Sequence, residues 1–277
     1  PRPPPTTPVT PRRQRQMCIR DRCIPDKIII INDNSTDNSQ SIIDTFVSEH
    51  SFIHTYLNKS DAIHKPGEKV VNAFYRGLTK TGDSFDLIGK FDADIILPID
   101  YFERMVSIFS SDDSVGIAGG NLFIKEKEEW IFENISSKKK VRGPIKIYRK
   151  KCFEEIGGLK KTIGWDTIDE LLAQYHGWKI KTDTSLHLKH LKHTGASYNR
   201  ESRYKQGEAF YKMRYGFLIS LIAAIKLGAR KKSFMFIINT MNGYYKALIN
   251  RKPYSVSEEE GIFIRNLRWR GIKKKLL

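Results

Sequence analysis

Aliphatic runs alternate with amphipathic segments from residue 27 onward, and this alternation limits the folds that the chain can adopt. The strand-like runs lie near 27–32, 53–57, 86–91 and 115–124, with shorter ones near 145–149 and 178–182. Between them, apolar residues recur at three- and four-residue steps, as in 39–50, 68–80 and 99–111. Strands that alternate with helices build βαβ units, so the sequence predicts an α/β fold with a mostly parallel sheet flanked by helices.

The pattern changes near residue 200, where strand-like runs disappear. Residues 203–228 and 233–250 each have the periodicity of a long helix. We therefore expect an α/β domain over 23–200 and a basic helical region over 201–277.

Residues 1–22 differ from everything that follows. Proline and arginine dominate them, and they have neither helical nor strand periodicity. Two interpretations fit: a disordered basic arm, or a non-native leader, because RQRQMCIRDR resembles the translation of a sequencing adapter. We favour the leader and leave this stretch out of the fold prediction.

The formal charge of +17 would attract phosphates, anionic lipid or nucleic acid, and it does not indicate which of them is the partner. No recognition-helix, zinc-finger or aromatic sheet motif indicates nucleic acid, so we expect none as a partner. The cysteines Cys18, Cys23 and Cys152 have no metal-binding spacing and no even-numbered framework, which favours a reducing, cytoplasmic location. The apolar run 215–225 is shorter than the roughly 20 residues of a spanning helix.

The C-terminal helices are basic and bear aromatic residues. Residues 226–277 contain thirteen Lys or Arg and three Glu, a net charge of +10. The aromatic residues are Phe234, Phe236, Tyr244, Tyr245 and Trp269. Such helices are expected either to contact the inner face of a membrane peripherally or to cap the α/β domain with a solvated basic face.

Small polar and acidic residues follow the first aliphatic run directly, beginning with Asp33, Asn34 and Ser35. Ligands of open parallel sheets gather beyond the carboxyl ends of the strands, where helix N-termini also point. An Asx turn that starts the next helix explains these residues equally well.

Two further acidic sites follow the same logic. Asp92 and Asp94 leave another buried strand, and two carboxylates one residue apart are able to share a divalent cation, although a solvated turn is the simpler alternative. Asp166 precedes a short amphipathic helix that continues through Asp169, where an acid is usually a helix cap.

The order of these motifs resembles glycosyltransferase family 2, whose members have the GT-A fold. The motifs are NDNSTDNS after the first strand, DAD, RGPIKIYRKKCFEEIGGL and GWDTIDELLAQYHGWK, within roughly residues 27–195. The resemblance implies an inverting enzyme that uses a nucleotide-sugar donor and a divalent metal, Mn²⁺ or Mg²⁺. It also implies a saccharide or lipid-linked acceptor in the synthesis of cell-surface polysaccharide.

The resemblance also implies roles for single residues. Asp33, with Asn34 and Ser35, matches the segment that contacts the nucleotide. Asp92 and Asp94 match the DXD motif, with Asp94 as the metal ligand and Asp92 at the metal or the ribose. Asp166 occupies the place of the catalytic base, and Asp169 is the alternative because Trp165 stands where the family has Glu.

Other positions are assigned by the same resemblance. Lys69 and Asn72 are expected in the nucleotide pocket, with solvated helix residues as the alternative. Arg142, Gly143 and Trp165 are expected to border the acceptor. His187 and His190 would face opposite sides of a strand, which argues against a three-histidine zinc site and leaves His193 as a metal or diphosphate contact, or an ordinary loop residue.

Family members begin with an aliphatic strand before the segment equivalent to KIIIIND, and here the leader stands in that place. We therefore expect an N-terminally truncated GT-A domain with weakened nucleotide binding. An active transferase, a catalytically impaired sugar-nucleotide-binding relative and, least favoured, a basic nucleic-acid-binding protein remain as alternatives.

Overall fold

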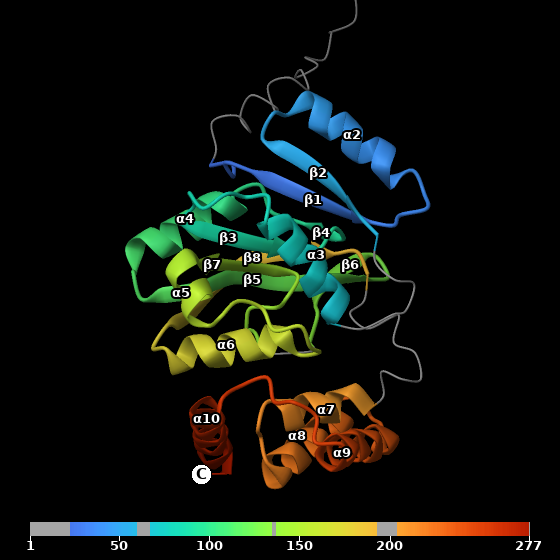
Figure 1. Cartoon of the computed structure of the whole chain (residues 1–277), viewed down its shortest axis with the longest axis vertical. Helices are drawn as coiled ribbons and strands as arrows, with labels where there is room; N and C mark the ends of the chain where they lie inside the picture. The colour runs from blue at the N-terminus through green and yellow to red at the C-terminus, as the bar shows by residue number, and fades with distance from the viewer. Residues whose placement is uncertain (1–22, 60–66, 135–136, 193–203, 277) are drawn as a thin grey trace, which may run out of the picture.

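The computed structural model describes residues 23–59, 67–134, 137–192 and 204–276, so the predicted leader lies outside the described part (Figure 1). Within it, strands β1 (Ile28–Asp33) and β2 (Ile53–Asn58) form a parallel pair. A six-stranded sheet has the order β3-β7-β5-β8-β4, with β6 paired to β5. Its strands are β3 (Leu87–Phe91), β4 (Ile95–Ile96), β5 (Val115–Glu126), β6 (Glu129–Phe132), β7 (Ile145–Arg149) and β8 (Lys179–His190).

Helices cover both faces of the larger sheet. On one face α4 (Tyr101–Ser111) buries Tyr101, Met105 and Phe109 against the strands. The other face carries α5 (Lys150–Glu155) and α6 (Trp165–Tyr175), which share one apolar core with α3 (Glu68–Leu78). Helix α2 (Ser39–Glu49) packs on the two-stranded sheet. The predicted α/β architecture with flanking helices is therefore confirmed.

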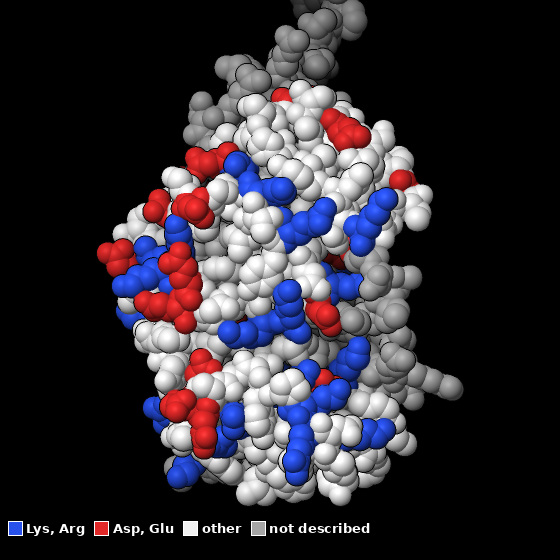
Figure 2. Space-filling view, in the orientation of Figure 1, with Lys and Arg blue, Asp and Glu red and all other residues white. Residues whose placement is uncertain are grey.

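The C-terminal region is helical, as predicted, and lies beside α6 (Figure 1). Its helices are α7 (Lys205–Lys212), α8 (Phe217–Arg230), α9 (Phe234–Ile249) and α10 (Glu258–Leu276). On the face in view, basic side chains lie over both the sheet-bearing part and this helical region (Figure 2). The positive charge is therefore not confined to one element.

The strand pairing corrects the expectation of a mostly parallel sheet. Pairs β1–β2 and β5–β8 are parallel, whereas β3–β7, β4–β8, β5–β6 and β5–β7 are antiparallel. A parallel connection needs a crossover, usually a helix. Strand β6 follows β5 through a tight turn at Lys127 and runs back along it, and β7 has the direction of β6, so both are antiparallel to β5.

The prediction of one long helix over 203–228 is wrong, since α7 and α8 are separate. Arg214 at φ 53° and Gly216 at φ 75° have left-handed backbone, and Tyr215 N donates to Phe210 O at 3.1 Å, which ends α7. The apolar period continues across the break because Phe210, Tyr215 and Ile219 pack into the same core. Periodicity alone therefore misses this turn.

Candidate functional site

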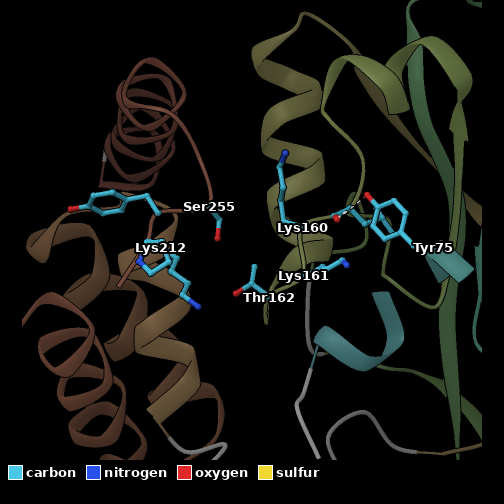
Figure 3. A pocket seen from close by; sticks show the side chains of 9 residues that line it. Tyr75, Lys160, Lys161, Thr162, Lys212 and Ser255 are labelled. Carbon is cyan, nitrogen blue, oxygen red and sulfur yellow. Dashed lines mark hydrogen bonds between the residues drawn. The ribbon is translucent and has the colours of Figure 1, made fainter. Parts of the chain in front are cut away.

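A cavity of about 570 Å³ lies between the loop that precedes α6 and the C-terminal helices (Figure 3). Lys160, Lys161 and Lys212 line it, and Lys212 is paired with Glu208 at 2.6 Å. None of the predicted site residues is among its lining residues. The candidate site is therefore built at the strand ends and at the start of α6.

The exit of β1 is shaped by amide hydrogen bonds. Asn32 is buried, and its Oδ1 accepts from Ser35 N at 3.0 Å, which closes an Asx turn around Asn34 at φ 58°. Asp33 Oδ1 accepts from Asn58 Nδ2 at 2.7 Å, across the last pair of β1 and β2. The turn interpretation and the ligand interpretation are thus compatible, because the turn leaves Asn34 and Ser35 exposed beyond the strand.

Asp37 has a local role in the same loop. Its Oδ1 accepts from Ser39 N at 3.0 Å, where α2 begins. Hydrogen bonds from the side chain and backbone of Ser39 hold the pKa of Asp37 below its ordinary value. This acid therefore stabilises the start of α2.

Asp92, the 142–144 loop and the start of α6 come together around Trp165. Lys90, at the end of β3, is ion-paired with Asp92, and its Nζ lies 5.1 Å from the centre of the Trp165 ring. A Cβ on Gly143 would lie 2.9 Å from Trp165 Cζ2 and 3.1 Å from Asp166 Cβ, so glycine lets the loop approach α6. Segments remote in sequence thus share one site.

Asp94 joins this site through a buried histidine. His190 Nε2 lies 3.7 Å from Asp94 Oδ1, and His190 Nδ1 lies 3.1 Å from Glu133 Oε2. Glu133 is also ion-paired with Arg142. A chain of polar neighbours therefore connects the predicted metal ligand Asp94 with the predicted acceptor residue Arg142.

Asp166 is half-buried in the first turn of α6. Burial by itself would raise the pKa of its carboxyl, but the charges of Lys140, Lys146, Arg142 and Lys90 outweigh burial and lower the pKa. The carboxylate is therefore ionised at neutral pH, in the state that accepts a proton.

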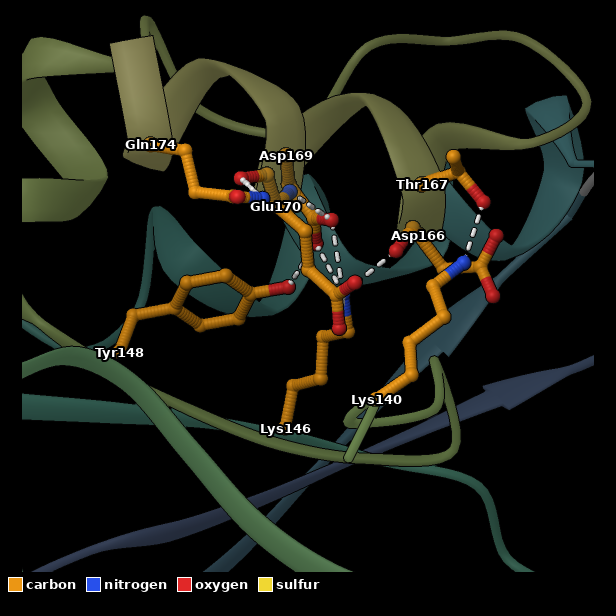
Figure 4. A network of polar contacts seen from close by, with 8 residues as sticks. All are labelled: Lys140, Lys146, Tyr148, Asp166, Thr167, Asp169, Glu170 and Gln174. Carbon is orange, nitrogen blue, oxygen red and sulfur yellow. Dashed lines mark hydrogen bonds and ion pairs between the residues drawn. The ribbon is translucent and has the colours of Figure 1, made fainter. Parts of the chain in front are cut away.

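Asp169 lies in a different environment, a closed network beside Asp166 (Figure 4). Its side chain is 1% exposed, and its two oxygens accept from Lys146 Nζ at 2.7 and 2.9 Å. Tyr148 Oη donates to Asp169 Oδ2 at 2.6 Å. Lys146 Nζ also donates to the backbone oxygen of Asp166 at 2.6 Å, so the network holds the start of α6 in place.

Glu170 adds a second buried acid to this network. Its Oε1 lies 3.6 Å from Lys146 Nζ and, within the described residues, accepts no hydrogen bond. Burial raises the pKa of Glu170 to about 7, because it outweighs the opposing charges of Lys146, which is already bound to Asp169, and Lys140. Near neutral pH this group is therefore partly protonated.

This raised pKa predicts a pH-dependent stability. Above its unfolded value of 4.5 and up to about 7, folded Glu170 keeps a proton that the unfolded chain has released. Its contribution to stability is therefore lost as pH rises through 7. We expect Glu170→Gln to reduce the fall in unfolding free energy between about pH 5 and about pH 8 by ~1 kcal/mol or more, measured by urea denaturation.

Glu154→Gln, at an exposed acid of α5, is the control and is expected to follow the wild-type pH curve. A wild-type pH dependence in the Glu170→Gln protein would contradict the assignment.

The remaining predicted residues of the nucleotide pocket and the metal site are Lys69, Asn72 and His193. Lys69 is half-buried and Asn72 is exposed on α3, the helix whose start lies against Thr162. A Cβ on Gly67, just before α3, would lie 2.6 Å from Thr162 O. Helix α3 thus approaches the loop before Asp166. His193 lies outside the described residues.

Sequence reasoning missed three residues of the site: Lys146, Glu133 and His190. Lys146 has a visible signal, a lysine inside the buried strand β7. His190 and His187 do lie on opposite faces of β8, as expected, with His190 buried and His187 exposed. The role of His190 depends on Glu133, 57 positions away, and no local pattern predicts that pair.

The sequence model described as Glycosyl transferase family 2 matches residues 17–163, more than half of the chain. The chain belongs to this family. The match includes Asp33, Asp92 and Asp94 and ends just before Asp166. Membership in glycosyl transferase family 2 supports the GT-A fold that the motifs imply.

Two glycosyltransferases of known structure are similar to this family 2 chain. One is a mannosyltransferase from Pyrobaculum calidifontis in complex with GDP-Man and Mn²⁺, with 13% identity and a TM-score of 0.47, covering 96% of this chain and 76% of the other. The other is GalNAc-T7 with UDP, GalNAc and Mn²⁺, with 12% identity and a TM-score of 0.48, covering 82% of this chain and 52% of the other. Comparison with curated proteins gives no match.

The donor atoms of this glycosyltransferase suit a hard divalent cation only in part. Asp94 offers a carboxylate that is 29% exposed, whereas Lys90 already binds one oxygen of Asp92. The described residues contain no group of three His, Cys, Asp or Glu side chains arranged to hold a metal ion. Mg²⁺ is often bound by one or two carboxylates together with substrate phosphates. Asp92 and Asp94 supply two carboxylates here.

Proposed function

We propose that this chain transfers a sugar, with inversion, from a nucleotide-sugar donor to a hydroxyl of a saccharide or lipid-linked acceptor in cell-surface polysaccharide synthesis. The observation that carries the proposal is the environment of Asp166. Four basic side chains keep this half-buried carboxylate ionised, and it lies at the meeting point of the β3 exit, the 142–144 loop and α6. Family membership supports a glycosyltransferase, and the proposal adds the stereochemistry, the donor and the acceptor.

Asp166 acts as the general base. An acceptor hydroxyl is a poor nucleophile, and a carboxylate that takes its proton during attack on the anomeric carbon contributes about 10²–10⁴-fold to the rate. Asp169 is the less suitable candidate, because its two oxygens are bound by Lys146 and Tyr148 and almost no surface is exposed. We therefore assign Asp169 to positioning.

The other residues divide between donor and acceptor. We assign Asp33, Asn34, Ser35, Lys69, Asn72 and Asp92 to the nucleotide sugar. Figure 1 shows that the carboxyl ends of β1 and β2 lie on the same side of the molecule as β4, which follows Asp94. We assign Trp165, Arg142 and Gly143 to the acceptor, since they surround Asp166.

Asp94 is the proposed metal ligand, with Asp92 as a weaker second ligand and His193 as a further contact. A bound Mn²⁺ or Mg²⁺ would offset the negative charge of the departing nucleoside diphosphate. His190 Nε2 lies 3.7 Å from the carboxylate of Asp94, and His190 Nδ1 lies 3.1 Å from Glu133. The chain thus supplies a partly exposed carboxylate with a histidine beside it at this position.

A donor-hydrolysis screen across nucleotide sugars, with Mn²⁺, Mg²⁺ or chelator, tests the function. We expect metal-dependent release of nucleoside diphosphate with one donor, and a fall of at least about tenfold for Asp94→Ala. Asp113→Ala, at an acid whose side chain is 97% exposed, is the matched control and should retain activity. Binding of a nucleotide sugar without turnover under any condition would instead identify a catalytically impaired relative.

A further inference from the structure

Helix α9 buries its small residues. Thr240, Gly243 and Ala247 are inside, and a Cβ on Gly243 would lie 1.9 Å from Tyr204 O. A Cβ on Gly207 in α7 would lie 1.7 Å from Thr240 O. The backbones of α7 and α9 therefore approach closely at these small residues, and Tyr244 is also buried on this side of α9, against Tyr211.

The opposite side of α9 exposes large apolar residues. Phe234 is 75% exposed, and Tyr245 and Ile249 are each 61% exposed. We call the following set the α9 face: Phe234, Met235, Ile238, Tyr245, Leu248 and Ile249. These positions recur at three-, four- and seven-residue steps, so they form one stripe along the helix. A helix packed on a soluble core has the reverse arrangement, and a continuous exposed apolar surface marks an interaction site.

Helix α8 carries more exposed apolar side chains. It packs on α9, where a Cβ on Gly228 would lie 2.4 Å from Ile237 Cγ1. Its exposed apolar residues are Phe217, Leu218, Ile222 and Ile225. Each of these two packed helices therefore exposes apolar side chains.

The charged residues in and around α8 and α9 are all basic. Residues 209–257 contain nine Lys or Arg and no Asp or Glu. Exposed basic residues lie at both ends of α9, with Lys231 and Lys232 before it and Arg251 and Lys252 after it. Figure 2 shows basic side chains next to uncharged surface in this region of the molecule.

We propose that the α9 face lies on the surface of an anionic lipid bilayer, with its apolar residues at the level of the acyl chains and the flanking lysines and arginines at the headgroups. Interfacial helices bind membranes in this way, by burying apolar side chains and by attraction between basic residues and anionic lipid. No helix within the described residues has the length and apolar character to cross a bilayer.

A second copy of the chain fits this surface less well. Two copies joined through their α9 faces would bring both sets of basic residues together, with no acid in 209–257 to pair with them. The inference goes beyond the transfer reaction and its test needs no turnover, so its failure and failure of the proposed function are separate results.

Flotation of the full chain with phosphatidylcholine vesicles, with and without phosphatidylglycerol, tests the proposal. We expect the protein to float with the anionic vesicles and to bind them at least about tenfold more tightly than the neutral ones. Binding should weaken at about 1 M salt, where the Debye length falls to about 3 Å.

Two pairs of variants separate the apolar and the charge contributions. Phe234→Ser with Tyr245→Ser should lower the vesicle partition coefficient at least about tenfold. Ile42→Ser with Phe46→Ser, at similarly exposed apolar residues of α2, is the control and should change it less than about twofold. Lys231→Gln with Lys232→Gln should lower anionic binding about tenfold or more, and Lys151→Gln with Lys181→Gln should not.

Thermal unfolding of each variant shows whether the fold is retained. Equal partitioning of the α9 and α2 variants would overturn the proposal, as would equal binding to neutral and anionic vesicles. A dimer in sedimentation velocity that Phe234→Ser with Tyr245→Ser dissociates would overturn it in favour of a second copy.

Discussion

Replacing Asp166 by Asn is expected to lower the turnover number of this glycosyltransferase about 10²–10⁴-fold while donor binding stays within about threefold of wild type. The asparagine has the size of the aspartate but cannot accept the acceptor's proton at neutral pH. The backbone oxygen of Asp166, which accepts from Lys146 at 2.6 Å, is unchanged by the substitution. The start of α6 therefore stays in place, and the loss reports on chemistry.

The pH profile gives a second measure of the same residue. Because the surrounding lysines and Arg142 lower the pKa of Asp166, the acidic limb of kcat/KM should lie below the ordinary carboxyl range. That limb should be absent from the residual activity of the Asp166→Asn protein.

Asp100→Asn is the matched control for this prediction. Asp100 also stands at a helix start, before α4, and its carboxylate is paired with Arg104 at 3.7 Å on the surface. We expect wild-type kinetics from it. Full activity of Asp166→Asn would remove Asp166 as the base, and an equal loss of donor affinity and turnover would move its role to nucleotide binding.

The second large effect is on stability, at the buried pair of Lys146 and Asp169. Their side chains are 0% and 1% exposed. Lys146→Met fills a similar volume but leaves the carboxylate of Asp169 buried with Tyr148 as its remaining side-chain donor. Loss of one partner from a buried ion pair costs about 3–5 kcal/mol, so we expect a decrease of that size in the free energy of unfolding, measured in urea.

A double-mutant cycle distinguishes the pair from general damage to the core. Lys146→Met combined with Asp169→Asn removes both charges, and we expect it to cost less than the sum of the two single substitutions. Lys125→Met is the control, because Lys125 pairs with Glu128 at 3.0 Å with side chains 50% and 92% exposed, and it should cost about 1 kcal/mol or less. If the losses of unfolding free energy from Lys146→Met and Asp169→Asn simply add in the double variant, Lys146 and Asp169 are not coupled.

The structure also separates the C-terminal aromatic residues into exposed and buried side chains. Phe234 and Tyr245 are exposed, whereas Tyr244 is 8% exposed and packs in the core with Tyr211. Tyr244 and Tyr245 are adjacent in sequence, and only the packing of α9 on α7 separates their roles.

The local pattern of side chains was sufficient to predict most helices and strands before β8. Strands β1, β2, β3 and β7 and helices α2, α3, α4 and α9 agree with the predicted segments to within a few residues, because the side-chain periods of strands and helices are local properties. The acidic residues at the strand exits and the basic character of the C-terminal helices are equally visible in the sequence.

Tertiary structure alone decided the pairings between distant segments. The antiparallel order around β7, the contact of His190 with Glu133 and the burial of Asp169 by Lys146 each join residues more than 20 positions apart. Asp166 and Asp169 are neighbours on one helix, yet one faces a ring of cations at the site and the other is enclosed by a lysine. Sequence alone specified which residue types reach this edge of the sheet. Long-range packing determined which carboxylate stays partly exposed and which is enclosed, because burial and charge neutralisation depend on side chains from other elements.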